Sequence, residues 1–152
     1  MIITFGHKNR ILEYNGIKIK ATCDVRNELN GRRKGIEIVT TKPDGIPYYP
    51  RVFPIGLWTV KKPVETKEKF LAPWFIPTTA TQLVETWTVK DALYDKKTGK
   101  TVTDGGYGIH FSTSETTLGC IRVGTIGDIE MLVDAINKAI EKRELVQLEV
   151  VE

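Results

Sequence analysis

The segment YGIHFSTSETTLGCIRVG, residues 107–124, carries the most informative pattern in this sequence. It holds His110 and Cys120, in a chain of 152 residues that has only two histidines and two cysteines. A thiol near neutral pH is mostly protonated, and an imidazole close to it can take up the proton and stabilise the thiolate. The pair therefore predicts nucleophilic catalysis, with Cys120 as the nucleophile and His110 as its general base.

Two residues beside Cys120 fit the same chemistry. Gly119 has no side chain over its backbone, so its N–H can reach a carbonyl oxygen that becomes an oxyanion. Arg122 offers a planar, permanently charged guanidinium that can hold a substrate carboxylate. A compact candidate site thus lies within thirteen consecutive residues, 110–122.

The order of the two residues, histidine first and cysteine second, is the reverse of that in papain-like proteases. The segment resembles the L,D-transpeptidase (YkuD-type) family, in which an Ile-His-Gly segment precedes Ser/Thr-His-Gly-Cys-Ile-Arg. Ile109 and His110 match the first part, and residues 117–122 match the second. Phe111 stands where the family prefers glycine, and Leu118 stands where it has a second histidine.

The resemblance also extends upstream and implies a fold. Pro54, Gly56 and Trp58 match a Pro-x-Gly-x-aromatic strand that leads towards the active site in the family. The implied architecture is mainly β (α+β), an L,D-transpeptidase-like β-sandwich of mixed sheets with one C-terminal helix after the catalytic cysteine. We expect residues 1–152 to form a single L,D-transpeptidase-like catalytic domain.

The function that the resemblance implies is a cysteine acyl transferase or peptidase that acts on peptidoglycan stem peptides. Cys120 would attack a stem-peptide carbonyl and form a thioacyl intermediate, with His110 acting first as base and then as acid. Water as the acceptor gives a carboxypeptidase or endopeptidase, and an amine gives a cross-linking transpeptidase. The implied oxyanion hole consists of the backbone N–H groups of Leu118, Gly119 and Cys120. The implied substrate-binding side chains are those of Arg122, Tyr107 and Trp58.

The composition restricts the other possibilities. The net charge of +3 and the isoelectric point of about 8.8 are too mild to predict a nucleic-acid partner. No apolar run approaches the ~18 residues of a membrane span, and two dispersed histidines and two cysteines predict neither a metal site nor a cofactor. The N-terminal residues do not resemble a secretory signal. We therefore expect synthesis in the cytoplasm and action on the cell wall, in the periplasm or outside, after release, as in a phage-type lysis enzyme (endolysin).

Two alternatives remain open at this point. One is a non-catalytic cell-wall-binding or virion structural module on the same fold, although a pure binder has no need of both His110 and Cys120. The other is a thiol switch that uses Cys23 and Cys120. Residues 17–23 alternate apolar and polar, which places Cys23 in the core, where a thiol is usually inert.

The remaining pattern predicts mostly strands. Residues 1–40 are predicted to form a β meander, with Asn15–Gly16 as a type I′ turn. A hairpin is expected to turn at residues 97–99, which are Lys-Thr-Gly. The one predicted helix covers about 127–143, because its apolar residues recur at helical spacing, and Thr125 or Asp128 can cap it. A closing strand is predicted over residues 145–151.

Overall fold

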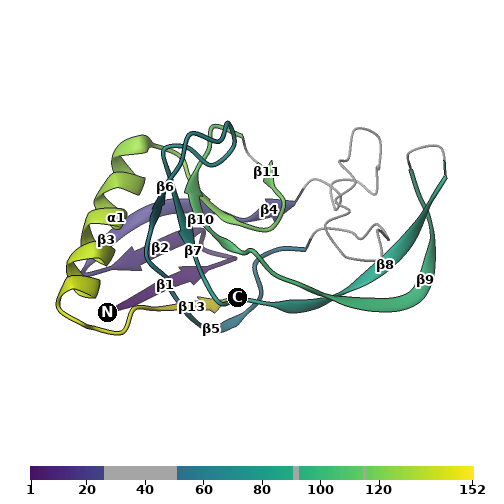
Figure 1. Cartoon of the computed structure of the whole chain (residues 1–152), viewed down its shortest axis with the longest axis horizontal. Helices are drawn as coiled ribbons and strands as arrows, with labels where there is room; N and C mark the ends of the chain where they lie inside the picture. The colour runs from purple at the N-terminus through teal and green to yellow at the C-terminus, as the bar shows by residue number, and fades with distance from the viewer. Residues whose placement is uncertain (26–50, 91–92, 115) are drawn as a thin grey trace.

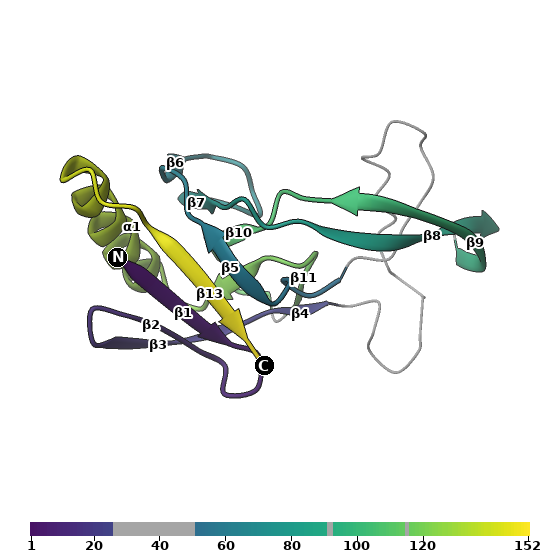
Figure 2. The same cartoon turned by 90° about the horizontal axis from the view of Figure 1, so that it is seen from below.

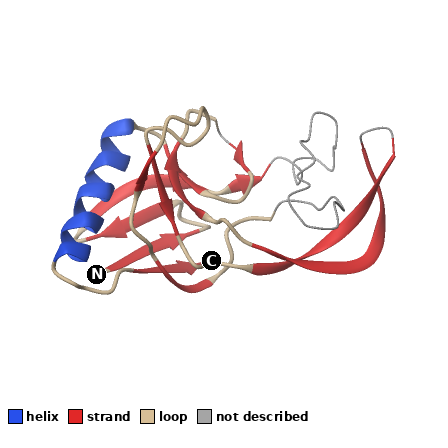
Figure 3. Ribbon diagram, viewed as in Figure 1, coloured by secondary structure: helices blue, strands red, loops and turns tan. Residues whose placement is uncertain are grey.

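The computed structural model describes residues 1–25, 51–90, 93–114 and 116–152, and the later part of the meander predicted for residues 1–40 lies outside them (Figure 1). The described part is mainly β, with one helix that follows Cys120 in the sequence (Figure 3). The predicted fold class, mainly β with a C-terminal helix and mixed sheets, is therefore confirmed at this level.

One large mixed sheet organises the structure. Its nine strands lie in the order β5-β13-β1-β2-β3-β12-β10-β7-β6. Two neighbouring pairs, β1 with β13 and β10 with β12, are parallel, and the others are antiparallel. The bounds are β1 Ile2–Gly6, β2 Ile11–Tyr14, β3 Ile17–Thr22, β5 Gly56–Thr59, β6 Val64–Glu65, β7 Trp74–Pro77, β10 Gly108–Phe111, β12 Ile121–Val123 and β13 Gln147–Val151.

The sheet curls until its two ends meet. Immediately beyond β5 and β7, Val60 and Thr78 form an antiparallel bridge. The Lys61 N–H donates to the Pro77 carbonyl at 2.9 Å, and the Thr79 N–H donates to the Thr59 carbonyl at 3.0 Å. Figure 2 shows β5 and β7 on the same side of the curled sheet. The curl encloses one hydrophobic core that includes Ile3, Phe5, Leu12, Ile76, Ile109, Ile121 and Leu148.

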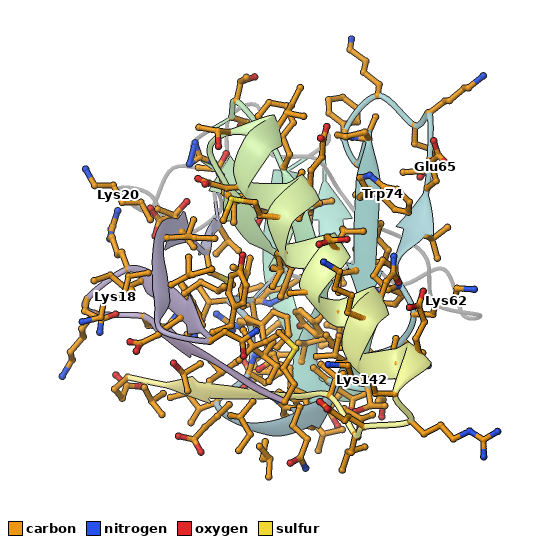
Figure 4. The ribbon with its side chains drawn as sticks, turned by 90° about the vertical axis from the view of Figure 1, so that its left-hand side faces the viewer. Lys18, Lys20, Lys62, Glu65, Trp74 and Lys142 are labelled. Carbon is orange, nitrogen blue, oxygen red and sulfur yellow. The ribbon has the colours of Figure 1, made fainter. Side chains whose placement is uncertain are left out.

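Helix α1, Ile126–Glu141, begins at the predicted cap. Thr125 has an extended backbone, and its hydroxyl accepts a hydrogen bond from the Asp128 N–H at 3.1 Å. One apolar stripe of the helix is buried and contacts β7, β10 and β12. The buried helix residues are Ile129, Leu132, Val133, Ile136 and Ala139. In Figure 4, Lys18 and Lys20 of β3 project on one side of this helix, and Trp74 and Glu65 lie on the other.

Two smaller strand pairs complete the fold. Strand β4, Asp24–Val25, pairs in parallel with β11, Thr116–Thr117. Strand β8, Gln82–Lys90, pairs with β9, Leu93–Asp104, in a long ribbon that extends away from the curled sheet (Figures 1 and 2). The hairpin predicted to turn at residues 97–99 is wrong, because β9 runs straight through them. Gly99 has a φ of 78° beside a register shift between Glu85 and Trp87, so its turn-like backbone forms part of a bulge.

The predicted turn at residues 15–16 and the predicted closing strand agree with the structure. Asn15 and Gly16 have φ values of 48° and 77°, as a type I′ turn requires, and they join β2 to β3. The predicted closing strand is confirmed as β13. Within the described residues, α1 is not long and apolar enough to cross a membrane.

Candidate functional site

The candidate site lies where β10 and β12 run side by side. His110 on β10 is the register partner of Arg122 on β12, and Ile109 is the partner of Ile121. Extending this register by one residue places Cys120 beside Gly108. Side chains alternate between the two faces of a sheet, so Cys120, which immediately precedes β12, lies on the same face as His110 of β10. The structure therefore brings together the two residues that the sequence paired.

The His110 side chain is only 6% exposed, and one ring nitrogen has a fixed partner. Its Nδ1 lies 2.9 Å from the carbonyl oxygen of Phe111. A carbonyl oxygen can only accept, so Nδ1 carries the proton and Nε2 is left as the basic nitrogen. Burial lowers the pKa of His110; the bond to Phe111 acts in the opposite direction, and the charge of Arg122 lowers the pKa further. His110 is thus a neutral imidazole with the tautomer that a general base at Nε2 needs.

The Cys120 thiol is half-buried and is held by the glycine segment before β10. Its Sγ lies 3.9 Å from the carbonyl oxygen of Gly106. Burial raises the pKa of Cys120 to about 11; a hydrogen bond from the Gly108 N–H lowers it, and the carboxylate of Asp104 raises it. Cys120 and His110 both lie in the part of the chain that the structure describes, and no hydrogen bond joins the Cys120 sulfur to the His110 ring. The resting pair is therefore a neutral thiol beside a neutral imidazole.

The hydroxyl of Thr117 makes two hydrogen bonds within the loop before Cys120. Thr117 Oγ1 accepts a hydrogen bond from the Gly119 N–H at 3.1 Å and donates one to the Cys120 carbonyl at 2.8 Å. The Gly119 N–H is therefore engaged within the loop, and the prediction that it helps to form an oxyanion hole is corrected. The N–H groups of Leu118 and Cys120 make no hydrogen bond to the described residues, so two of the three predicted donors are still available.

Gly119 is required at its position for two reasons. Its φ of 120° lies in a region that residues with a side chain rarely adopt. A Cβ on Gly119 would also lie 2.5 Å from the Arg51 carbonyl oxygen and 2.6 Å from Cε1 of Tyr107. The backbone before Cys120 thus packs directly against the Tyr107 ring and the Arg51 carbonyl.

Arg122 braces the loop between β10 and β12. Its Nε donates to the Ser112 carbonyl at 3.2 Å, and its Nη1 lies 3.4 Å from the hydroxyl of Thr22 on β3. The predicted role of this guanidinium is to hold a substrate carboxylate, whereas its contacts with Ser112 and Thr22 fit a role in bracing the loop.

Tyr107 is a support rather than a substrate contact, which corrects the prediction. Its side chain is 2% exposed. Its hydroxyl donates to Oδ2 of Asp104 at 2.6 Å and accepts from Nε2 of Gln82 at 2.8 Å. Gln82 also donates to the Val52 carbonyl at 2.8 Å. The Tyr107 ring is therefore held in one position, and it packs directly against Gly119.

Trp58, the third predicted substrate-binding side chain, has no hydrogen bond or ring contact with Cys120 or His110 among the described residues. It lies on β5, whose described neighbours are β13 and, through the bridge at Val60, the end of β7. Its indole N–H donates to the Pro54 carbonyl at 2.9 Å, and its ring packs against the core and fills the space that a Cβ on Gly56 would need. The Pro-x-Gly-x-Trp pattern at these positions thus describes local packing of β5.

The other histidine has a structural partner. His7 Nε2 donates to the Phe53 carbonyl oxygen at 2.8 Å, and its ring stands edge-on to Phe5. Since the ring is bonded in this way, His7 is a histidine whose hydrogen bonding is satisfied within the fold.

The sequence missed one contact of the site, made by Cys23. This thiol is 4% exposed; it lies 3.1 Å from the Gly119 carbonyl oxygen and accepts the Phe53 N–H at 3.0 Å. Burial raises the pKa of Cys23 to about 12, and the nearby Cys120 also raises it. The alternation of residues 17–23 correctly placed Cys23 inside, but nothing in the sequence signals its contact with residue 119.

Comparisons with protein-family models, with curated proteins and with solved structures find no match for this chain. Within the described residues, no group of three or more histidine, cysteine or acidic side chains is placed to hold a metal ion.

Proposed function

We propose that this chain is a cysteine acyl transferase or peptidase of the L,D-transpeptidase type, a single catalytic domain that acts on peptidoglycan stem peptides. The observation that carries the proposal is the parallel pairing of β10 with β12, which sets Cys120, the residue just before β12, on the same face as His110. The motif around them supports the substrate class, since its resemblance is to enzymes of the cell wall. The mainly β architecture, with one helix that follows the cysteine and strand β12, is compatible with that family's fold.

The proposed reaction begins with proton transfer. The Cys120 side chain turns from the Gly106 carbonyl towards Nε2 of His110, which takes up the thiol proton as the sulfur attacks a stem-peptide carbonyl carbon. A carbon–sulfur bond forms, the amide carbon–nitrogen bond breaks, and His110 returns the proton to the leaving amine. Water or a second amine then cleaves the thioester and restores the thiol. No cofactor is required by this scheme.

The test is incubation of the protein with purified muropeptides and identification of the products by mass. The expected products lack the residue that follows the attacked carbonyl, or carry a new amide bond to an acceptor. Cys120→Ala is the matched control, because it removes the sulfur and leaves the fold of the loop. Unchanged muropeptides with folded wild-type protein contradict the proposal.

A second candidate function is a non-catalytic cell-wall-binding or virion structural module. The resting state of the pair favours it, since the Cys120 pKa is about 11 and the sulfur contacts Gly106 rather than His110. Binding of the wild-type protein and of Cys120→Ala to purified cell-wall sacculi, with no change in the muropeptides, is the result that this candidate predicts.

The site of action is proposed to be the cell wall, reached after release from the cytoplasm. Expression in a bacterium with and without an attached secretion signal tests this. Altered muropeptides only in the secreted form support it, whereas unchanged muropeptides with folded protein in the periplasm favour the binding module.

A further inference from the structure

The buried thiol of Cys23 makes two hydrogen bonds, one of them to Gly119, the residue that precedes Cys120. Its sulfur accepts the Phe53 N–H at 3.0 Å, and its S–H donates to the Gly119 carbonyl at 3.1 Å. Cys23 is 4% exposed, and its neighbours Ala21 and Val25 are buried as well. A thiol in such a setting stays protonated at ordinary pH, so it remains a donor.

The acceptor of this bond belongs to the same peptide unit as the Cys120 N–H. In a planar trans peptide the carbonyl and the N–H point in opposite directions. Because the Gly119 carbonyl is directed at Cys23, the Cys120 N–H points in the opposite direction, away from the Cys23 thiol. The Cys120 N–H makes no hydrogen bond to the described residues, and it belongs to the residue that carries the nucleophilic sulfur.

The Gly119–Cys120 peptide needs this anchor because Gly119 offers little resistance to rotation. A glycine populates positive and negative φ about equally, so its flanking peptide planes turn easily. On the N-terminal side, Thr117 Oγ1 holds the Gly119 N–H at 3.1 Å. On the C-terminal side, the Gly119 carbonyl has the Cys23 thiol as its hydrogen-bond donor. The two contacts together fix both peptide planes of Gly119.

We propose that Cys23 is a positioning residue that orients the Cys120 N–H as an oxyanion donor. The inference rests on the proposed acyl-transfer chemistry of Cys120, but not on its substrate. Cys23 does not touch the substrate; it acts through the Gly119 carbonyl. An oxyanion donor matters only where a carbonyl carbon is attacked, and it has no role in alkylation of the same sulfur, which forms no oxyanion.

The test compares two reactions of Cys120 at one pH. In the first, p-nitrophenyl acetate acylates the sulfur: a carbon–sulfur bond forms, the ester carbon–oxygen bond breaks, and p-nitrophenolate leaves. In the second, iodoacetamide alkylates the sulfur and iodide leaves. In both, the thiol proton passes to His110 or to water. Cys120→Ala gives the background rate to subtract, and thermal unfolding shows that each variant is folded.

In Cys23→Ala we expect acylation about tenfold to hundredfold slower, because loss of a well-placed oxyanion donor costs about 10²–10³ and here the donor is misdirected rather than removed. Alkylation should stay within about twofold of wild type, since the sulfur and its surroundings are kept. Cys23→Ser should restore most of the acylation rate, because its hydroxyl can donate to the same carbonyl. If Cys23→Ala does not fold, Cys23→Val, which fills more of the space without a donor, takes its place.

An unchanged ratio of acylation to alkylation in the variant without a donor overturns the inference, and so does an equal loss of both rates. Failure of the proposed function has a different signature. If wild-type Cys120 acylates but leaves muropeptides unchanged, the substrate class is wrong and the role of Cys23 stands. If wild-type Cys120 is not acylated above the Cys120→Ala background, the proposed acyl-transfer function and the positioning role of Cys23 are both overturned.

Discussion

His110 and Arg122 are direct partners on the parallel strands β10 and β12, and this pairing places Cys120 one residue before β12 on the face that His110 shares. The arrangement is made by backbone pairing and not by a contact between imidazole and thiol. Both groups are neutral at rest: burial lowers the pKa of His110 and raises that of Cys120 to about 11. Reactivity at neutral pH must therefore arise when a substrate is attacked, not from a preformed ion pair.

The pH dependence of alkylation tests this resting state. Below a pKa of about 11, the thiolate fraction of Cys120 falls about tenfold for each unit by which pH is lowered. The rate of iodoacetamide labelling should therefore rise steadily from about pH 7 to about pH 10, with no plateau near neutrality. Peptide mapping should find the label on Cys120 and not on the buried Cys23. A pH-independent rate around neutrality, or earlier labelling of Cys23, contradicts the neutral pair.

Removal of the Asp104 charge should make Cys120 more reactive. The Asp104 carboxylate raises the pKa of Cys120, so Asp104→Asn should lower that pKa and speed alkylation at neutral pH, by up to about tenfold. Asparagine keeps an oxygen that can accept the Tyr107 hydroxyl. The control is Asp134→Asn, an exposed carboxylate on α1 paired with Lys138, which should leave the alkylation rate unchanged. An Asp104→Asn rate equal to that of wild type would show that this charge does not act on the thiol.

The two histidines should separate in function. His110→Ala should slow acylation of Cys120 by about 10²–10⁴, the usual cost of losing a general base, in a protein that still folds. His7→Ala should leave acylation nearly unchanged and lower the free energy of unfolding by about 1 kcal/mol, because it removes one hydrogen bond to the Phe53 carbonyl. Acylation and urea unfolding of both variants give the comparison. Equal losses of acylation in both would mean that His110 is not the base.

Gly119 should be intolerant of any side chain. Gly119→Ala combines a strained φ with overlap against the Arg51 carbonyl and Tyr107, and we expect it to lower the free energy of unfolding by about 2–4 kcal/mol. The matched control is Gly127→Ala in the first turn of α1, where a Cβ meets nothing within 4 Å and φ is not positive. That change should stabilise by about 0.4–1 kcal/mol, since alanine has fewer unfolded conformations. Similar unfolding curves for the two variants would refute the assigned backbone geometry.

Much of the fold follows from local signals in the sequence. Asn15–Gly16 forms the expected turn because both residues tolerate positive φ, and α1 starts at Thr125 because its hydroxyl satisfies a helix N–H. Gly99 misled the prediction for the same local reason: a glycine with positive φ serves a bulge as well as a turn. Only the pairing with β8, a tertiary feature, decides between the two.

The site was predictable to the extent that its chemistry is local in sequence. His110, Cys120 and Arg122 lie in one motif, and the structure brings them together. The partners of Tyr107 and Cys23 come from segments far away in the chain, such as Gln82 and Gly119. No spacing rule reports such contacts, so Tyr107 was assigned to the substrate when it supports the loop.

We propose that Cys120 forms a thioacyl intermediate with a peptidoglycan stem peptide. The most direct measurement is the intact mass of the protein after rapid mixing with a purified stem-peptide substrate and acid quenching. We expect an added mass equal to the acyl part of the substrate and mapped to Cys120. This mass should be absent in Cys120→Ala and should build up far more slowly in His110→Ala. Folded wild-type protein with no added mass, together with unchanged substrate, would contradict it.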